Sequence, residues 1–135
     1  MAYEKAEDLY KVFELTLQKV LKDEKLVEAL GGTGMIVGIK VPNIDATMTL
    51  ELKGSLKYSF GPTELKPDVT TVNDDVIFNQ FWQGKLNLIM AMTKGQVKST
   101  GAVTKMLKIL PKIGPIYKMY AESLKEAGRE DLIIK

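Results

Sequence analysis

Residues 35–60 read MIVGIKVPNIDATMTLELKGSLKYSF, and apolar residues alternate along them with smaller or polar residues. A period of two residues is typical of strands that bury one face and expose the other. The alternation is interrupted twice, by the turn sequence PNID and by a turn around Gly54. We therefore predict three antiparallel strands, at 35–41, 46–53 and 55–60, which form a meander with one face in water.

The lengths of the two turns also predict the register of these strands. A four-residue loop and a three-residue loop place every apolar residue on the same face, whereas a slip of one residue would turn the apolar side chains of a strand toward water. The pairs that we expect are Val41 with Ala46, Ile39 with Met48, Leu52 with Leu56, and Leu50 with Tyr58.

Helical periodicity precedes the meander, and strand and helix signals alternate after it. Residues 3–30 carry apolar residues at spacings of three and four and end before Gly31 and Gly32, which predicts one long amphipathic helix. After the meander we expect a fourth strand at 69–72, a helix capped by Asn73 and ending at Gly84, a second short helix at 87–93, and a fifth strand at 96–100.

The C-terminal part is helical but interrupted. Pro111 and the pair Gly114-Pro115 break it, because proline fixes its own torsion and disfavours helix in the residue before it.

Together these elements predict an α/β fold class, of the α+β kind, with a five-stranded mainly antiparallel sheet, a crossover after the third strand, and helices on one face. A length of 135 residues fits one domain, residues 1–135.

The composition excludes several kinds of chemistry. The chain contains no cysteine and no histidine, so a zinc site of the usual nitrogen and sulfur type, a thiol nucleophile and a serine–histidine triad are all ruled out. A net charge of +2 is too small to indicate nucleic acid as a partner. Because the side chains for these chemistries are missing, we expect that the protein is not an enzyme. Residues 1–8 are charged and lack the apolar core of a signal peptide, so we expect a cytoplasmic protein.

Three short motifs stand in an order that is known from one family. They are DVTTV at 68–72, FWQGKLN at 81–87 and GQVKSTG at 95–101, and a short apolar helix separates each from the next. This order resembles the C-terminal half of sterol carrier protein type-2 domains, over roughly residues 35–110. The resemblance implies a non-catalytic lipid carrier, without a cofactor, that holds a fatty acid, fatty acyl-CoA, isoprenoid or sterol-like ligand in an apolar cavity.

Aromatic residues and methionines gather in the predicted helices after the meander. At helical spacing such residues are most often ordinary core, but methionine is flexible and polarizable and also lines surfaces that accept several shapes. Together with the family resemblance, they become the predicted ligand-binding residues. These are Phe78, Phe81, Trp82, Met90, Met106, Leu110, Ile113, Tyr117 and Tyr120.

Two further interpretations concern the C-terminal helices. Residues 102–127 are expected to close over the pocket as a mobile lid, because the helix breaks at Pro111 and Gly114 are natural hinges. Lys105, Lys108 and Lys112 form a basic row, which we interpret as a solvated face. The alternative is contact with anionic lipid headgroups or a coenzyme A phosphate.

The expected partner is a lipid or acyl-CoA ligand. The sequence also allows a transient contact with a membrane surface and a homodimer. The alternative function is an interaction or dimerisation module of a larger lipid-metabolising assembly, and in that case the core is filled. Lipid that is co-purified with the protein would distinguish a carrier from such a module.

Overall fold

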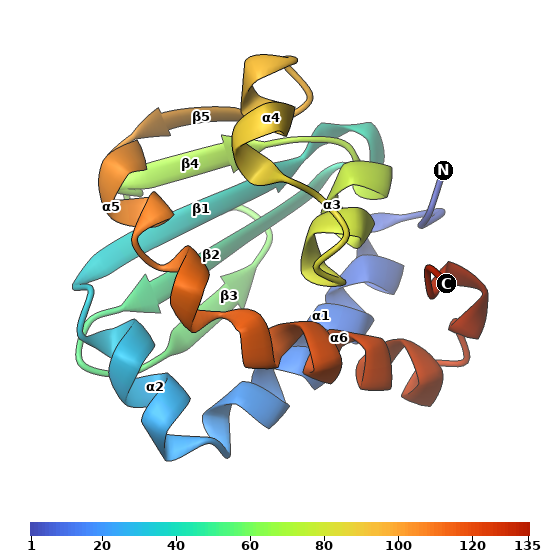
Figure 1. Ribbon diagram of the computed structural model, residues 1–135, viewed down its shortest axis with the longest axis horizontal. Coiled ribbons are helices and arrows are strands. Elements are labelled where there is room, and N and C mark those ends of the chain that lie inside the picture. Colours follow the sequence, from blue (N-terminus) through green and yellow to red (C-terminus); the bar gives the residue numbers. More distant parts are fainter.

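The computed structural model describes all residues, 1–135, and arranges them as a five-stranded sheet with helices over one of its faces (Figure 1). The strands are β1 (Met35–Val41), β2 (Ala46–Leu52), β3 (Lys57–Phe60), β4 (Val69–Val72) and β5 (Lys98–Gly101). They lie in the order β3-β2-β1-β4-β5, and every neighbouring pair is antiparallel except β1 and β4. The predicted fold class is confirmed.

Six α-helices accompany the sheet. They are α1 (Ala6–Leu21), α2 (Glu24–Gly31), α3 (Asp75–Trp82), α4 (Leu88–Thr93), α5 (Val103–Leu107) and α6 (Gly114–Glu126). Short 3-10 helices follow β1, α5 and α6, at Pro42–Ile44, Leu110–Lys112 and Glu130–Leu132. α6 packs along α1, and the two helices are also joined by an ion pair between Lys19 and Glu126. No helix is long and apolar enough to cross a membrane.

The predicted register of the meander is confirmed over most of its length. Val41 pairs with Ala46 and Ile39 with Met48, and Leu50 pairs with Tyr58. The ladder between β2 and β3 ends at Glu51 and Lys57, one position before the predicted pair of Leu52 with Leu56, because the chain around Gly54 has left the sheet.

The prediction of one N-terminal helix is wrong, because the helix breaks at Lys22 and Asp23. The side chain of Asp23 accepts a hydrogen bond from the backbone N–H of Leu26 and caps a second helix, α2. Aspartate is unfavourable inside a helix but strongly favoured at this capping position. The turn lets Leu26 and Leu30 reach the core. The first residue of α3 also differs from the prediction, since Asp74 rather than Asn73 caps that helix by accepting from Ile77 N.

The return from β5 into α5 requires glycine at position 101. Its φ of +89° lies in the left-handed region, and a Cβ there would stand 2.1 Å from the carbonyl oxygen of Asp68. Only glycine allows so close an approach of two backbones. Asp68 also extends the junction between β1 and β4, because its side chain accepts from Ile36 N at 2.7 Å.

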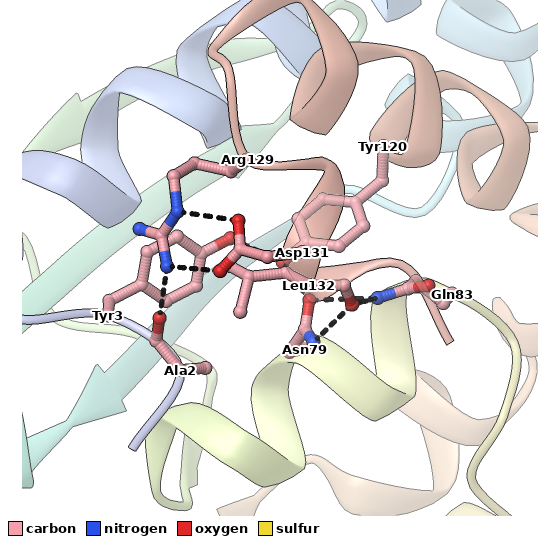
Figure 2. Close-up of polar contacts among 8 residues, drawn as sticks. All are labelled: Ala2, Tyr3, Asn79, Gln83, Tyr120, Arg129, Asp131 and Leu132. Atoms are coloured by element: carbon pink, nitrogen blue, oxygen red, sulfur yellow. Dashed lines mark hydrogen bonds and ion pairs between the residues drawn. The ribbon is translucent and has the colours of Figure 1, made fainter. Parts of the chain in front are cut away.

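A buried hydrogen-bond network joins the two ends of the chain to α3 and α6 (Figure 2). The hydroxyls of Tyr3 and Tyr120 lie 2.5 Å apart, and the Tyr120 hydroxyl donates to Asn79 Oδ1 at 2.8 Å. Both tyrosines are fully buried. Burial raises the pKa of Tyr3 and of Tyr120 above the usual range of a phenol.

The same network holds the C-terminal tail against α3. The side-chain amides of Asn79 and Gln83 donate to the carbonyl oxygen of Leu132, and Gln83 Oε1 accepts from Ile134 N. Figure 2 shows Arg129 between the N-terminal segment and the tail, where it donates to Ala2 O and pairs with Asp131. We call this set of contacts the terminal clasp.

Candidate functional site

An apolar pocket of about 120 Å³ lies between the sheet and the helices that cover it. Twenty of its 22 lining residues are hydrophobic, and the two polar ones are Thr71 and Asn73. Ligand sites are typically concave and mostly apolar, with a few polar groups that orient the ligand. The pocket has this composition.

The floor of the pocket comes from the alternation that predicted the sheet. Val37 and Ile39 of β1 and Leu50 and Leu52 of β2 point from the sheet toward the helices. The apolar stripe of α1 contributes a wall through the side chains of Phe13, Leu17 and Val20.

The wall formed by α3 is aromatic and tightly interlocked. The ring centroids of Phe13 and Trp82 lie 5.1 Å apart, those of Phe13 and Phe78 5.3 Å, and those of Phe81 and Trp82 5.0 Å, all in edge-to-face arrangements. Such contacts stabilise each pair by about 0.5–1.5 kcal/mol beyond the area that they bury. This wall is therefore the rigid side of the pocket.

The opposite side is aliphatic and comes from the interrupted helices. Met106, Ile109, Leu110, Ile113 and Ile116 line the pocket from α5, the following 3-10 helix and the start of α6. The backbone here changes from α to 3-10 and back between Leu107 and Gly114, about two turns of helix, because Pro111 supplies no N–H donor. Flexible aliphatic side chains on a broken helix can shift more easily than interlocked rings.

Six of the nine predicted ligand-binding residues line this pocket, and three do not. Those at the pocket are Phe78, Phe81, Trp82, Met106, Leu110 and Ile113. Met90 lies on the outer side of α4 and is 52% exposed, because α4 turns Ala91 inward instead. Tyr120 is held away from the pocket by Tyr3 and Asn79.

The third residue outside the pocket, Tyr117, packs beside it. Its ring lies against Gly84, where a Cβ would come within 2.8 Å of the tyrosine Cδ2, and edge-on to Phe81 with centroids 6.3 Å apart. It thus buttresses a pocket residue. That any of the nine side chains contacts a ligand stays a prediction.

The sequence interpretation missed the part of the lining that comes from the first half of the chain. α1, α2 and the two central strands supply Phe13, Leu17, Val20, Leu30, Val37, Ile39, Leu50 and Leu52. The signal was present as the apolar stripe of the helix and the apolar face of the meander. It could not be separated from core packing, because a pocket wall and a filled core have the same periodicity.

The polar residues lie at one end of the pocket, where it meets β4 and β5. Thr71 faces the pocket, and its cross-strand partner Ser99 lies on the same face of the sheet. The hydroxyl of Ser99 is buried and has no hydrogen-bond partner. Thr71 and Asn73 are only partly buried, as are the apolar lining residues Phe81, Leu88 and Leu110, whereas the other lining residues are buried. We call these five partly buried residues the mouth of the pocket.

Comparison with solved structures gives the fold its name. Sterol carrier protein 2 from Yarrowia lipolytica, in its apo form, superposes with a TM-score of 0.58 over 90% of this chain and 94% of that one, at 17% identity. A sterol carrier protein domain from Helicoverpa armigera gives 0.55 over 83% and 89%, at 24% identity. The chain has the sterol carrier protein 2 fold. In both cases the match covers most of this chain and most of the other protein.

The same fold also occurs within a much longer enzyme. The stereoselective inverting sec-alkylsulfatase Pisa1 from Pseudomonas sp. matches 74% of this chain with a TM-score of 0.54 at 25% identity, but the match covers only 14% of the sulfatase. Neither a protein-family sequence model nor a curated protein sequence matches the chain.

Proposed function

We propose that this protein is a non-catalytic lipid carrier of the cytoplasm, which holds the apolar chain of a fatty acid, fatty acyl-CoA, isoprenoid or sterol-like ligand in its pocket. The observation that supports this most directly is the lining, in which 20 of 22 residues are hydrophobic around an unfilled volume. Transfer of an apolar chain from water into such a site is favourable by about 25 cal/mol per Å² of buried surface, before the losses of association.

The volume limits how the ligand is accommodated. Drug-sized ligand sites span roughly 300–1,000 Å³, whereas this pocket measures about 120 Å³ without ligand. The pocket takes a few methylene groups as it stands and must widen for a complete acyl chain or a sterol. The aliphatic side at Met106, Ile109 and Leu110 supplies that movement, since the α3 wall is interlocked. The polar end at Thr71 and Asn73 suits the head group of an amphipathic ligand.

The test begins with the protein as purified. Extraction with organic solvent followed by mass spectrometry should release a lipid in near-stoichiometric amount. Titration of delipidated protein with a fatty acid and with its acyl-CoA should then give saturable binding by calorimetry and a change in the fluorescence of Trp82, the only tryptophan, which lines the pocket.

A matched pair of variants makes this test specific. Leu110→Trp places a larger side chain in the partly exposed lining and should weaken lipid binding by about tenfold, because overfilling costs about 1–3 kcal/mol. Leu65→Trp adds the same ring at a 39% exposed position outside the pocket and should bind like the wild type. Equal binding by both variants, or no binding by the wild-type protein, would show that the pocket is not a lipid site.

A second candidate function is an interaction or dimerisation module of a larger lipid-metabolising assembly. The sulfatase match favours it, since there the fold occupies a small part of a long enzyme. In that case the protein purifies without lipid and forms a dimer or a complex in sedimentation velocity. A monomer that carries lipid would exclude this alternative.

A further inference from the structure

The charges of this protein are distributed unequally along the chain. Residues 76–121 contain seven lysines and no aspartate or glutamate. The other 89 residues contain 12 basic and 17 acidic residues, a net charge of −5. The overall charge of +2 therefore conceals a strongly cationic segment.

These lysines are free to meet an external anion. All seven are exposed, and neither of the two salt bridges in the structure involves any of them. They are Lys85, Lys94, Lys98, Lys105, Lys108, Lys112 and Lys118. They extend from the end of α3 to α6. Three of them, Lys94, Lys105 and Lys108, lie in or directly after α4 and α5, and these two helices stand at the two ends of β5 (Figure 1).

The same segment exposes apolar side chains and frames the mouth of the pocket. Ile89 and Met90 on α4 are 61% and 52% exposed, more than any other large hydrophobic residue except Met1. Lys85 precedes α4 and Lys94 caps its end. The partly buried apolar residues of the mouth, Phe81, Leu88 and Leu110, all belong to this segment as well.

We propose that residues 76–121 form a docking surface for an anionic lipid bilayer. The lysines contact the headgroups, Ile89 and Met90 enter the interface, and the mouth of the pocket faces the membrane. A surface that combines unpaired lysines with exposed apolar residues is complementary to anionic headgroups above an apolar interior. The orientation of the mouth rests on the proposed lipid-carrier function, whereas docking itself does not.

The N-terminal helices are unsuited to the same role. Residues 1–34 hold five lysines and seven acidic residues, so anionic lipid would repel this part of the chain on balance. The proposal therefore places residues 76–121, and not the N-terminal helices, against the membrane.

The test measures co-sedimentation with vesicles of phosphatidylcholine alone and of phosphatidylcholine mixed with phosphatidylserine. We expect binding to the mixed vesicles only, with an affinity that falls as salt is added. Lys85→Gln/Lys94→Gln/Lys108→Gln should weaken it by about a hundredfold, since each surface lysine contributes about fivefold. Lys11→Gln/Lys22→Gln/Lys25→Gln removes the same charge from exposed lysines outside the segment and should change binding by less than about threefold.

A second pair of variants tests the apolar part of the surface. Ile89→Ser/Met90→Ser should weaken binding by about tenfold, whereas Leu21→Ser/Leu65→Ser, at positions 39% exposed elsewhere, should not. The proposal is overturned if the two triple lysine variants lose equal vesicle affinity, or if the wild type does not bind mixed vesicles. It is also overturned if the wild type binds an acidic protein specifically instead of the vesicles. Binding of a soluble fluorescent fatty acid without vesicles, which the lysine variants should retain, separates failure of docking from failure of the carrier function.

Discussion

Removal of one buried hydroxyl should destabilise the terminal clasp more than removal of two. The perturbation is Tyr120→Phe. This substitution deletes the oxygen that accepts the hydrogen bond from the Tyr3 hydroxyl. The Tyr3 hydroxyl has no other partner and belongs to a fully buried side chain. A buried donor left without a partner costs about 1–3 kcal/mol, and the lost hydrogen bonds add about 1 kcal/mol. We expect the free energy of unfolding to fall by about 2–4 kcal/mol.

The companion variants distinguish this reasoning from a simple loss of contacts. Tyr3→Phe leaves Tyr120 still donating to Asn79, so it should cost only about 1 kcal/mol. Tyr3→Phe/Tyr120→Phe leaves no orphaned donor, and Asn79 Oδ1 still accepts from Gln83 at 2.9 Å. The double variant should therefore be more stable than Tyr120→Phe alone, with a coupling energy of at least about 1 kcal/mol.

Urea unfolding followed by far-ultraviolet circular dichroism measures these free energies by linear extrapolation. Tyr117→Phe is the matched control, because it removes a hydroxyl from the same helix that makes no hydrogen bond, and it should lie within about 0.5 kcal/mol of the wild type. The reasoning about the orphaned hydroxyl is refuted if the double variant is the least stable of the three. It is also refuted if the decrease in its free energy of unfolding equals the sum of the decreases in the two single variants.

Three further predictions follow from the clasp and the pocket. Burial raises the pKa of Tyr3 and Tyr120, so the folded state keeps protons that the unfolded chain loses above about pH 10. The free energy of unfolding should therefore fall as the pH rises beyond that value, and it should fall less steeply in Tyr3→Phe/Tyr120→Phe. Burial opposes ionisation of Asp75, but hydrogen bonds from Tyr3 N, Asn43 and Ala2 N outweigh burial and lower the pKa of its carboxyl. The free energy of unfolding should therefore fall as the pH drops below about 4, and Asp75→Asn should flatten that part of its pH profile. Bound lipid should slow amide exchange at residues 102–113 more than in β2, and equal protection of both segments would contradict a lid there.

The structure narrows the part of the C-terminal region that can act as this lid. The sequence predicts a mobile segment over 102–127, but Ile116, Tyr120 and Leu124 of α6 are buried in the main core. α6 also packs along α1 and carries a member of the terminal clasp. We therefore expect a chain that ends at residue 114 to unfold, since three core side chains are lost with α6.

The sequence by itself determined the elements and the register of the meander. Alternation in 35–60 and turns of fixed length leave one arrangement that buries every apolar residue, and local capping signals place most helix ends within a few residues. It did not reveal that the N-terminal helix breaks at Asp23, because the apolar stripe continues through the break and the benefit of the turn lies in contacts with distant residues.

Only the tertiary structure decided which apolar residues surround the pocket and which fill the core. Tyr120 and Phe78 belong to the same predicted set, yet a hydroxyl contact with Tyr3, 117 positions away, takes the tyrosine into the clasp while the phenylalanine stays at the pocket. Met90 is likewise exposed, because α4 turns another residue inward. Periodicity reports which face of an element is apolar, whereas a void is set by how several faces meet, and that depends on contacts between residues far apart in the chain.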